Sequence, residues 1–261
     1  MTPDRVHVDI QEAENGPVVL MLHGWGSSSA LMRPLVDRLA GSARIVSVDF
    51  PGHGQSPPPH TAWDIPAHAA LVRRLVEDSR RPVILVGHSN GGRVALHLLS
   101  EPDPPEAVTA LVLIAPSGIR RKRTASTRFK AGLARVLKAP FQVLPGSLRA
   151  LGVDWLRHSL LWKALSSSDY QALDGVMRET FVKCVNHYVE DRLDRIGVPV
   201  LIFRGDGDDA ITAEQVDRLV SGLPDAGLYT VPGAGHYAHL DAPDVVTEGI
   251  RSFFPAGRTN P

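Results

Sequence analysis

A serine between a predicted strand and a predicted helix is the first feature of this chain that could do nucleophilic chemistry. The apolar run Val83–Val86 predicts a buried strand, and Asn90–Leu99 has helical spacing. A strand that becomes a helix within a residue or two forces the intervening Ser89 into a strained backbone conformation. Only small neighbours tolerate that conformation, and Gly87 and Gly91 meet this need. The sequence therefore predicts a nucleophile elbow that lifts the Ser89 hydroxyl above the sheet edge.

A serine hydroxyl is a poor nucleophile near neutral pH until a base removes its proton, and the base needs a third group to orient it. In an open parallel sheet, these groups belong in loops at the carboxyl ends of strands. One predicted strand, Val198–Phe203, is followed by a loop rich in aspartate. The last predicted strand, Gly227–Val231, leads into a glycine-rich loop that ends in His236. Since no other of the eleven histidines has this placement, we expect His236 to be the base.

Three aspartates compete for the orienting role: Asp206, Asp208 and Asp209. Asp208 is preferred because it lies three residues past Gly205, where the chain has left the strand and can turn toward His236. The other two suit the capping of the turn or of the following helix, which is a common task for aspartate.

The tetrahedral intermediate of acyl transfer carries a negative oxygen, which needs two preorganised amide donors, each worth roughly 3 kcal/mol in the barrier. The Asn90 N–H at the start of the elbow helix supplies one donor. The second belongs in the loop after the strand Val18–Leu22, where Trp25 lies between two glycines and its N–H is the expected donor. We expect His23 in the same loop to support the backbone rather than to contact substrate.

No cofactor or metal is expected. A calcium loop that began at Asp206 would need glycine at its sixth position and glutamate at its last, but Ile211 and Asp217 occupy these positions. The single cysteine, Cys184, excludes a cysteine-rich metal site. Its place in the middle of a predicted helix also argues against a nucleophilic role.

Strands and helices alternate along most of the chain, which predicts an α/β fold with a mostly parallel sheet flanked by helices on both faces. The predicted strands are Val6–Ile10, Val18–Leu22, Arg44–Val48, Val83–Val86, Val108–Ala115, Val198–Phe203 and Gly227–Val231. The predicted helices are Leu31–Leu39, Ile65–Arg80, Asn90–Leu99, Thr212–Ser221 and Asp244–Phe254. The first strand should lie at a half-exposed edge, with Gly16 and Pro17 ending its hairpin.

The alternation stops between residues 119 and 196, where the sequence is helical and shows no clear strand. The helices predicted there are Arg128–Lys138, Leu148–Leu165, Ser168–Met177 and Glu179–Leu193. We expect residues 1–118 and 197–261 to form one core and residues 119–196 to form a helical cap inserted on its sheet. Trp155 and Trp162 suit an apolar cap interior, where they either pack the cap or line a pocket for an acyl or aromatic group.

Composition narrows the class of partner. The chain has 261 residues with 28 basic and 28 acidic side chains, which gives no general attraction to nucleic acid or membrane and favours a small-molecule substrate. The N-terminal residues have no apolar signal core, and no apolar run reaches membrane-spanning length, so we expect a cytoplasmic protein without stable membrane insertion. The basic run Arg120–Arg123 suits a solvated cap face or the docking of an anionic partner. The oligomeric state stays open.

Together, these motifs resemble those of the α/β-hydrolase fold superfamily. The matching segments are Gly87-His88-Ser89-Asn90-Gly91-Gly92, His23-Gly24-Trp25, Asp49-Phe50-Pro51-Gly52-His53-Gly54-Gln55-Ser56, the loop of Gly205 and Asp208, and Gly233-Ala234-Gly235-His236. The resemblance implies that Ser89, Asp208 and His236 hold the positions of nucleophile, acid and base. It also implies a helical lid in the cap position. A serine nucleophile argues against the dehalogenase and epoxide hydrolase branches, whose nucleophile is aspartate.

The resemblance leaves three functions open. The favoured one is a serine hydrolase that cleaves a carboxylic ester or thioester through an acyl-enzyme. The second is a proton-abstracting lyase, because Ser89 through Arg93 is similar to the menaquinone-pathway lyases, and Arg93 could bind an anionic substrate. A structural role for Arg93 is the favoured alternative to substrate binding. The third is a ligand-binding member with little turnover.

Overall fold

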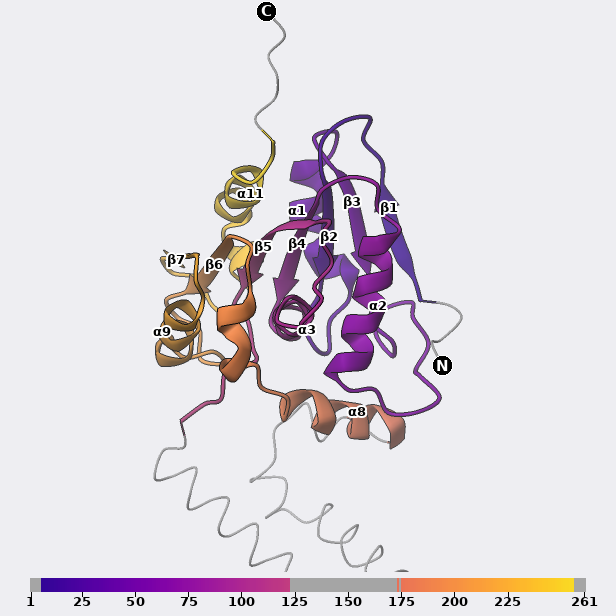
Figure 1. The fold of residues 1–261 in the computed structure, drawn as a ribbon, viewed down its shortest axis with the longest axis vertical. Coiled ribbons are helices and arrows are strands. Elements are labelled where there is room, and N and C mark those ends of the chain that lie inside the picture. Colours follow the sequence, from indigo (N-terminus) through magenta and orange to yellow (C-terminus); the bar gives the residue numbers. More distant parts are fainter. Residues whose placement is uncertain (1–5, 123–172, 174, 256–261) are drawn as a thin grey trace, which may run out of the picture.

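The fold is built on one sheet of seven strands within the residues that the computed structural model describes, which are 6–122, 173 and 175–255 (Figure 1). The strands are β1 (Val8–Gln11), β2 (Val18–Leu22), β3 (Arg44–Val48), β4 (Val83–His88), β5 (Val108–Ile114), β6 (Val200–Gly205) and β7 (Ala226–Val231). Their order across the sheet is β1-β3-β2-β4-β5-β6-β7. Only β1 runs antiparallel to its neighbour. The predicted α/β architecture with a mostly parallel sheet is confirmed.

The expected hairpin after the first strand is wrong. β1 pairs with β3, with Val8 opposite Val48, and β2 lies on the far side of β3. Gly16 has a φ of 90° and turns the chain, but the turn carries it past β3 rather than back along β1. The sequence favours a local pairing here, whereas in the structure β2 pairs in parallel with both β3 and β4 and is buried along its whole length.

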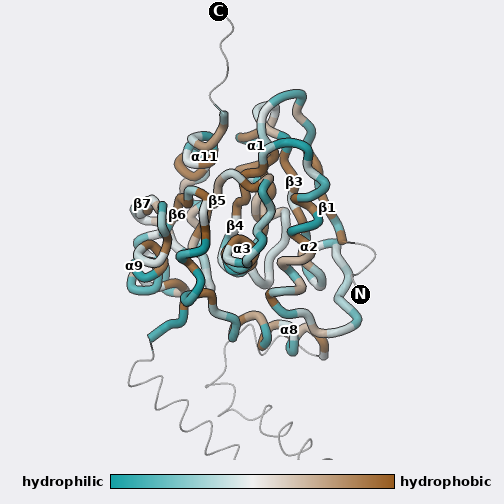
Figure 2. Tube along the Cα trace, viewed as in Figure 1, coloured by the Kyte–Doolittle hydropathy of each residue, from teal (hydrophilic) through white to brown (hydrophobic). Residues whose placement is uncertain are grey.

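Helices cover both faces of the sheet, which explains why its central strands are apolar at consecutive positions. On one face, Val18, Leu20 and Leu22 pack with α2 (Ile65–Glu77), α3 (Asn90–Leu99) and α9 (Ala213–Gly222). On the other face, Val19 and Met21 pack with α1 (Arg33–Leu39) and α11 (Pro243–Arg251). Figure 2 shows this apolar centre inside more hydrophilic outer segments. Two short elements complete these layers: the 3-10 turn η1 (Ser29–Met32) and the helix α10 (Ala238–Asp241).

The predicted helix Glu179–Leu193 is wrong in its extent. The structure has a helix α8 (Gly175–Val185) and a separate 3-10 turn η2 (Glu190–Arg195). The helix ends because the Asn186 side chain donates to the Val182 carbonyl and the Val189 N–H bonds to the Gly118 carbonyl, 3.1 Å away. That second bond draws the chain back onto the core.

The predicted helices Arg128–Lys138 and Leu148–Leu165 lie outside the described residues, as does most of Ser168–Met177. The division of the chain into a core and a cap therefore stays a prediction. Within this stretch the structure describes α8, which lies across the lower end of the described part of the chain in Figure 1.

The turn from β4 into α3 leaves no room for side chains at its glycines. A Cβ atom on Gly87 would lie 2.7 Å from the Cα atom of Gly92. A Cβ atom on Gly91 would overlap the carbonyl oxygen of Leu22, at the end of β2. Both obstacles are backbone atoms, which cannot rotate away, so the glycines are a steric requirement of the elbow.

We expect Gly91→Ala to lower the free energy of unfolding by about 2 kcal/mol, because overpacking of this kind outweighs the roughly 1 kcal/mol that alanine gains in helix propensity. Urea denaturation measures this difference. Gly197→Ala is the matched control, since its Cβ would meet nothing within 4 Å, and its stability should stay within about 0.5 kcal/mol of the wild type. Equal denaturation midpoints for the two variants would contradict the steric argument.

Candidate active site

Ser89 has the strained conformation that the sequence predicts. Its φ of 49° and ψ of −110° place it between β4 and α3, and Ala115 is the only other non-glycine residue with positive φ in the described part of the chain. Its N–H donates to the Ile114 carbonyl at 3.0 Å. Its carbonyl accepts from the backbone N–H and the hydroxyl of Ser117, at 3.0 and 3.1 Å. The loop after β5 thus holds the elbow in place.

The structure pairs two of the three expected catalytic residues. His236 Nδ1 lies 3.0 Å from Asp208 Oδ2, and the other carboxylate oxygen accepts from the N–H groups of Ala210 and Ile211 at 2.8 and 2.9 Å. Burial acts to raise the pKa of Asp208, but the bond from His236 and the two amide bonds outweigh it and lower the pKa. The ionised carboxylate fixes the proton on Nδ1, which leaves Nε2 of the neutral imidazole as an acceptor.

The other two aspartates of this loop, Asp206 and Asp209, have different surroundings. Asp206 is exposed and accepts from the N–H of Gly233 at 2.9 Å, so it ties its loop to the loop of His236. Asp209 is exposed at the loop surface. Of the three, Asp208 alone contacts the His236 ring within the described residues, which agrees with the expected preference.

The loop after β2 lies directly beside the elbow. A Cβ atom on Gly24 would be 3.2 Å from the Cβ atom of Ser89. In the part of the chain that the structure describes, neither the Trp25 nor the Asn90 backbone N–H donates to a carbonyl. Two backbone donors are thus left without an internal acceptor close to the serine, as an oxyanion site requires.

His23 supports this loop, as the sequence indicated. Its Nε2 accepts from the Phe50 N–H at 3.0 Å, so Nδ1 carries the proton and donates to the Gly24 carbonyl at 2.7 Å. Burial lowers the pKa of His23 to about 4, which keeps the ring neutral and this pattern fixed.

Arg93 is a buried structural contact in this structure. Its guanidinium Nη1 donates to the Cys184 carbonyl at the end of α8 and lies 3.4 Å from the side-chain oxygen of Asn90. Burial lowers its pKa to about 10. Within the described residues its Nη1 contacts these two oxygens, and its Nε has no hydrogen-bond partner. The other two substrate-binding candidates, Trp155 and Trp162, lie outside the described residues and stay predictions.

Cys184 lies next to the last residue of α8, not in the middle of a longer helix as predicted. Its thiol is buried, and burial raises its pKa to about 12. A thiol with this pKa is protonated at neutral pH, so the expectation that Cys184 is no nucleophile agrees with its surroundings.

Sequence reasoning did not single out the side chains by which α8 contacts the loops around the elbow. The Phe181 ring lies 5.1 Å from the Trp25 ring, and Met177 fills the space that a Cβ atom on Gly52 would occupy. Thr180 accepts from the Trp63 N–H at 3.1 Å. Met177 and Phe181 are four residues apart, a spacing that places them on one helix face and could have indicated them.

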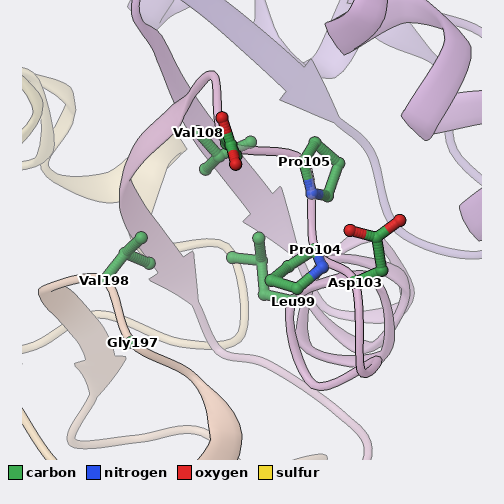
Figure 3. Close-up of a pocket in the computed structure, with 8 residues that line it drawn as sticks. Leu99, Asp103, Pro104, Pro105, Val108, Gly197 and Val198 are labelled. Carbon is green, nitrogen blue, oxygen red and sulfur yellow. The ribbon is translucent and has the colours of Figure 1, made fainter.

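A cavity of about 420 Å³ lies elsewhere on the molecule (Figure 3). It is lined by the proline-rich loop after α3, including Pro104 and Pro105, and by Val108 and Val198. Val108 begins β5 and Val198 lies two residues before the start of β6, whereas Ser89 follows the carboxyl end of β4. This cavity is therefore at the opposite edge of the sheet from the candidate site.

Within the described part of the chain, no group of three or more His, Cys, Asp or Glu residues is placed to hold a metal ion. In the same residues, no helix combines the length and the apolar character needed to cross a membrane.

Comparison with known proteins now identifies the family. Residues 19–248 match the model of the alpha/beta hydrolase family, and the chain belongs to this family. It is 28% identical to the 2-(acetamidomethylene)succinate hydrolase of Mesorhizobium japonicum, over 97% of this chain and 93% of the relative. It is 29% identical to the pimeloyl-[acyl-carrier protein] methyl ester esterase of Nitrosomonas europaea, over 91% of this chain and 95% of the relative.

Solved structures show the same fold. An esterase from Exiguobacterium antarcticum superposes with a TM-score of 0.70 at 22% identity, covering 95% of this chain and 94% of the esterase. MenH from S. aureus superposes with a TM-score of 0.67 at 20% identity, covering 95% of this chain and 97% of MenH. The expected α/β-hydrolase fold and family are thus confirmed.

Buried neutral histidines around the site make stability fall in acid. Burial lowers the pKa of both His23 and His68 to about 4, against 6.5 in an unfolded chain. Between these pH values the unfolded state binds more protons, so the free energy of unfolding decreases as pH falls from about 6.5 to 4, by about 3 kcal/mol for each residue.

We expect His68→Asn to reduce this dependence, because asparagine can still donate to the Asp64 carbonyl that His68 Nδ1 contacts at 2.7 Å but does not titrate. Urea denaturation at pH 7 and pH 4 should show a stability loss about 3 kcal/mol smaller than in the wild type. His60→Asn, at an exposed position, should follow the wild type. If His68→Asn and the wild type lost the same free energy of unfolding between pH 7 and pH 4, His68 would not be a source of the pH dependence.

Proposed function

We propose that this protein is a serine hydrolase that cleaves a carboxylic ester or thioester of a small molecule. Ser89, His236 and Asp208 are the proposed nucleophile, base and acid. The observation that carries the proposal is the 3.0 Å pairing of His236 with Asp208, in a chain whose turn from β4 into α3 bears a serine with positive φ. All three residues follow carboxyl ends of strands of one sheet, where ligands bind in open α/β folds.

The proposed reaction proceeds in two steps. His236 takes the proton of Ser89, whose oxygen attacks the substrate carbonyl, and the tetrahedral oxyanion accepts hydrogen bonds from the Trp25 and Asn90 amides. His236 then gives its proton to the leaving alcohol or thiol, which leaves an acyl-enzyme. In the second step His236 removes a proton from water, the hydroxide attacks the acyl carbonyl, and Ser89 regains its proton. Asp208 stabilises the imidazolium that forms in each step.

The relatives support hydrolysis rather than elimination. Both curated relatives are named for hydrolytic reactions, one on a methyl ester and one on 2-(acetamidomethylene)succinate. The lyase alternative depends on an arginine that faces an anionic substrate. Arg93 is buried and donates to the Cys184 carbonyl instead, which favours its structural role. A ligand-binding protein with little turnover is the outcome that the following experiment distinguishes.

The first test is covalent labelling of the serine. A fluorophosphonate probe should label the wild type at one site, and Ser89→Ala should abolish the label because the attacking oxygen is gone. Intact-protein mass spectrometry measures the adduct. Unlabelled wild type should also release a burst of p-nitrophenol from a short p-nitrophenyl ester, because acylation by such an activated ester is faster than deacylation. A label that persists in Ser89→Ala would refute the nucleophile, and labelling without turnover on an ester and thioester panel would favour the ligand-binding alternative.

The second test addresses the proposed role of Asp208 as the acid of the triad. Asp208→Asn should lower kcat by about 10⁴-fold, because an uncharged amide at this position favours the wrong imidazole tautomer and does not stabilise the imidazolium. Asp209→Asn, in the same loop but exposed, is the matched control and should keep the wild-type kcat. Steady-state kinetics on the best ester of the panel measures both. Similar kcat values for the two variants would contradict the role of Asp208.

A further inference from the structure

His88 is a buried histidine that the proposed reaction does not use. It is the last residue of β4, directly before Ser89, and its exposed fraction is 2%. Its ring lies between the loop after β2 and the loop of His236, so it touches two of the segments that must be placed correctly around the serine.

The hydrogen bond of His88 fixes its protonation state. Its Nε2 lies 3.0 Å from the backbone carbonyl oxygen of His236. A carbonyl oxygen can only accept, so Nε2 carries the proton and donates. Burial holds the pKa of His88 well below its usual range, with the nearby His239 and His236 adding to this effect. The ring is therefore neutral, and its Nδ1 has no proton.

The unprotonated edge of the ring packs against the loop after β2. A Cβ atom on Gly24 would lie 2.8 Å from His88 Nδ1, which is closer than such atoms approach without displacement. Glycine at this position lets the loop of Trp25 approach both the His88 ring and the elbow. One imidazole thus contacts one loop through its Nδ1 edge and the other through its Nε2 proton.

The loop that carries His236 needs such a contact. It runs from Pro232 to His236, and Gly233 in it has a φ of 72°. Its first part is held by the bond from the Gly233 N–H to Asp206 and by the bond from the Gly235 N–H to Asp241. Within the described residues, the bond from His88 is the one hydrogen bond made by the backbone of His236 itself.

We propose that His88 is a positioning residue for the catalytic base: its Nε2–H holds the backbone of His236, so that the imidazole paired with Asp208 keeps its place relative to Ser89. This inference rests on the proposed function. His88 acts on the reaction through His236 and does not contact substrate. A displacement of about 1 Å in a reacting group can cost 10²-fold in rate, which sets the expected effect of losing this bond.

The electrostatic surroundings agree with this role. The His88 ring centroid lies 4.9 Å from that of His236, 4.7 Å from that of His239 and 5.1 Å from that of Tyr237. His23, from the loop after β2, is the further titratable neighbour, and burial lowers the pKa of both His23 and His239 to about 4. When His236 becomes an imidazolium during the reaction, these neutral rings do not repel it, whereas a protonated His88 would.

Two substitutions at His88 test the loss of its hydrogen-bond donor separately from a change in side-chain volume. In His88→Gln the amide nitrogen is the same number of bonds from Cβ as Nε2 and can donate to the His236 carbonyl. In His88→Met the side chain fills similar space but has no donor. We expect His88→Met to lower kcat by about 100-fold with KM changed less than about 3-fold, and His88→Gln to recover kcat to within about 5-fold of the wild type. His97→Met, a buried histidine near the other end of α3, is the control and should keep the wild-type kcat.

Nuclear magnetic resonance tests the same inference without substrate. In ¹⁵N-histidine spectra of the wild type, His88 should carry its proton on Nε2, and the Nδ1–H proton that His236 shares with Asp208 should give a downfield resonance. That resonance should broaden or shift in His88→Met and be restored in His88→Gln. The tautomer of His88 is determined from the wild-type spectrum alone. The inference can therefore be tested even if the His88→Met variant does not fold.

Several outcomes would overturn the inference. These are an Nδ1–H tautomer of His88 in the wild type, an unchanged kcat in His88→Met, or equal losses in His88→Gln and His88→Met. Failure of the proposed function is distinct: the wild type would then take no fluorophosphonate label and cleave no ester, while the tautomer and the His236 resonance would still report whether His88 holds the base.

Discussion

The positive φ of Ser89 is the constraint on which the rest of the structure depends. A non-glycine residue held there costs on the order of 1–3 kcal/mol and persists only where its surroundings determine it. Here the cost is offset by hydrogen bonds from both sides: the Ser89 N–H donates to β5, and Ser117 donates twice to the Ser89 carbonyl. Glycines at positions 87 and 91 let β2 and α3 approach this backbone. The strain is thus maintained by three neighbouring segments, and two of them, the loop after β2 and α3, also carry the expected oxyanion donors.

The parallel sheet converts separate stretches of sequence into one site. Because β2, β4, β5, β6 and β7 run in the same direction, the loops after their carboxyl ends meet at one edge. This rule predicts the candidate site: a glycine-rich loop with a histidine and an aspartate-rich loop are expected near the elbow. The choice of Asp208 over its two neighbours also followed, since distance from the strand end decides which carboxylate can reach the ring. Its pairing with His236 agrees with that reasoning.

Other features depend on contacts that the sequence pattern does not contain. Apolar alternation predicted a strand at Val6–Ile10, and β1 spans Val8–Gln11. The alternation could not tell that β3, not β2, is the partner of β1, because edge pairing depends on where the chain crosses the sheet. Helical periodicity continued through Asn186, whereas a side-chain bond to Val182 and a bond from Val189 to Gly118 end the helix. The proposed role of His88 could not be predicted from the sequence either, because its hydrogen-bond partner is the backbone of a residue far along the chain.

The histidines around the elbow differ in whether they are hydrogen-bonded to a carboxylate. His23, His88 and His239 are all buried, and burial lowers the pKa of each. None of the three makes a hydrogen bond to a carboxylate within the described residues, whereas His236 is paired with the buried Asp208. A positive charge that forms among these rings is therefore stabilised on His236 alone. In the proposed mechanism, the neutral rings act as rigid hydrogen-bonding and packing groups near His236 and do not compete with it for the serine proton.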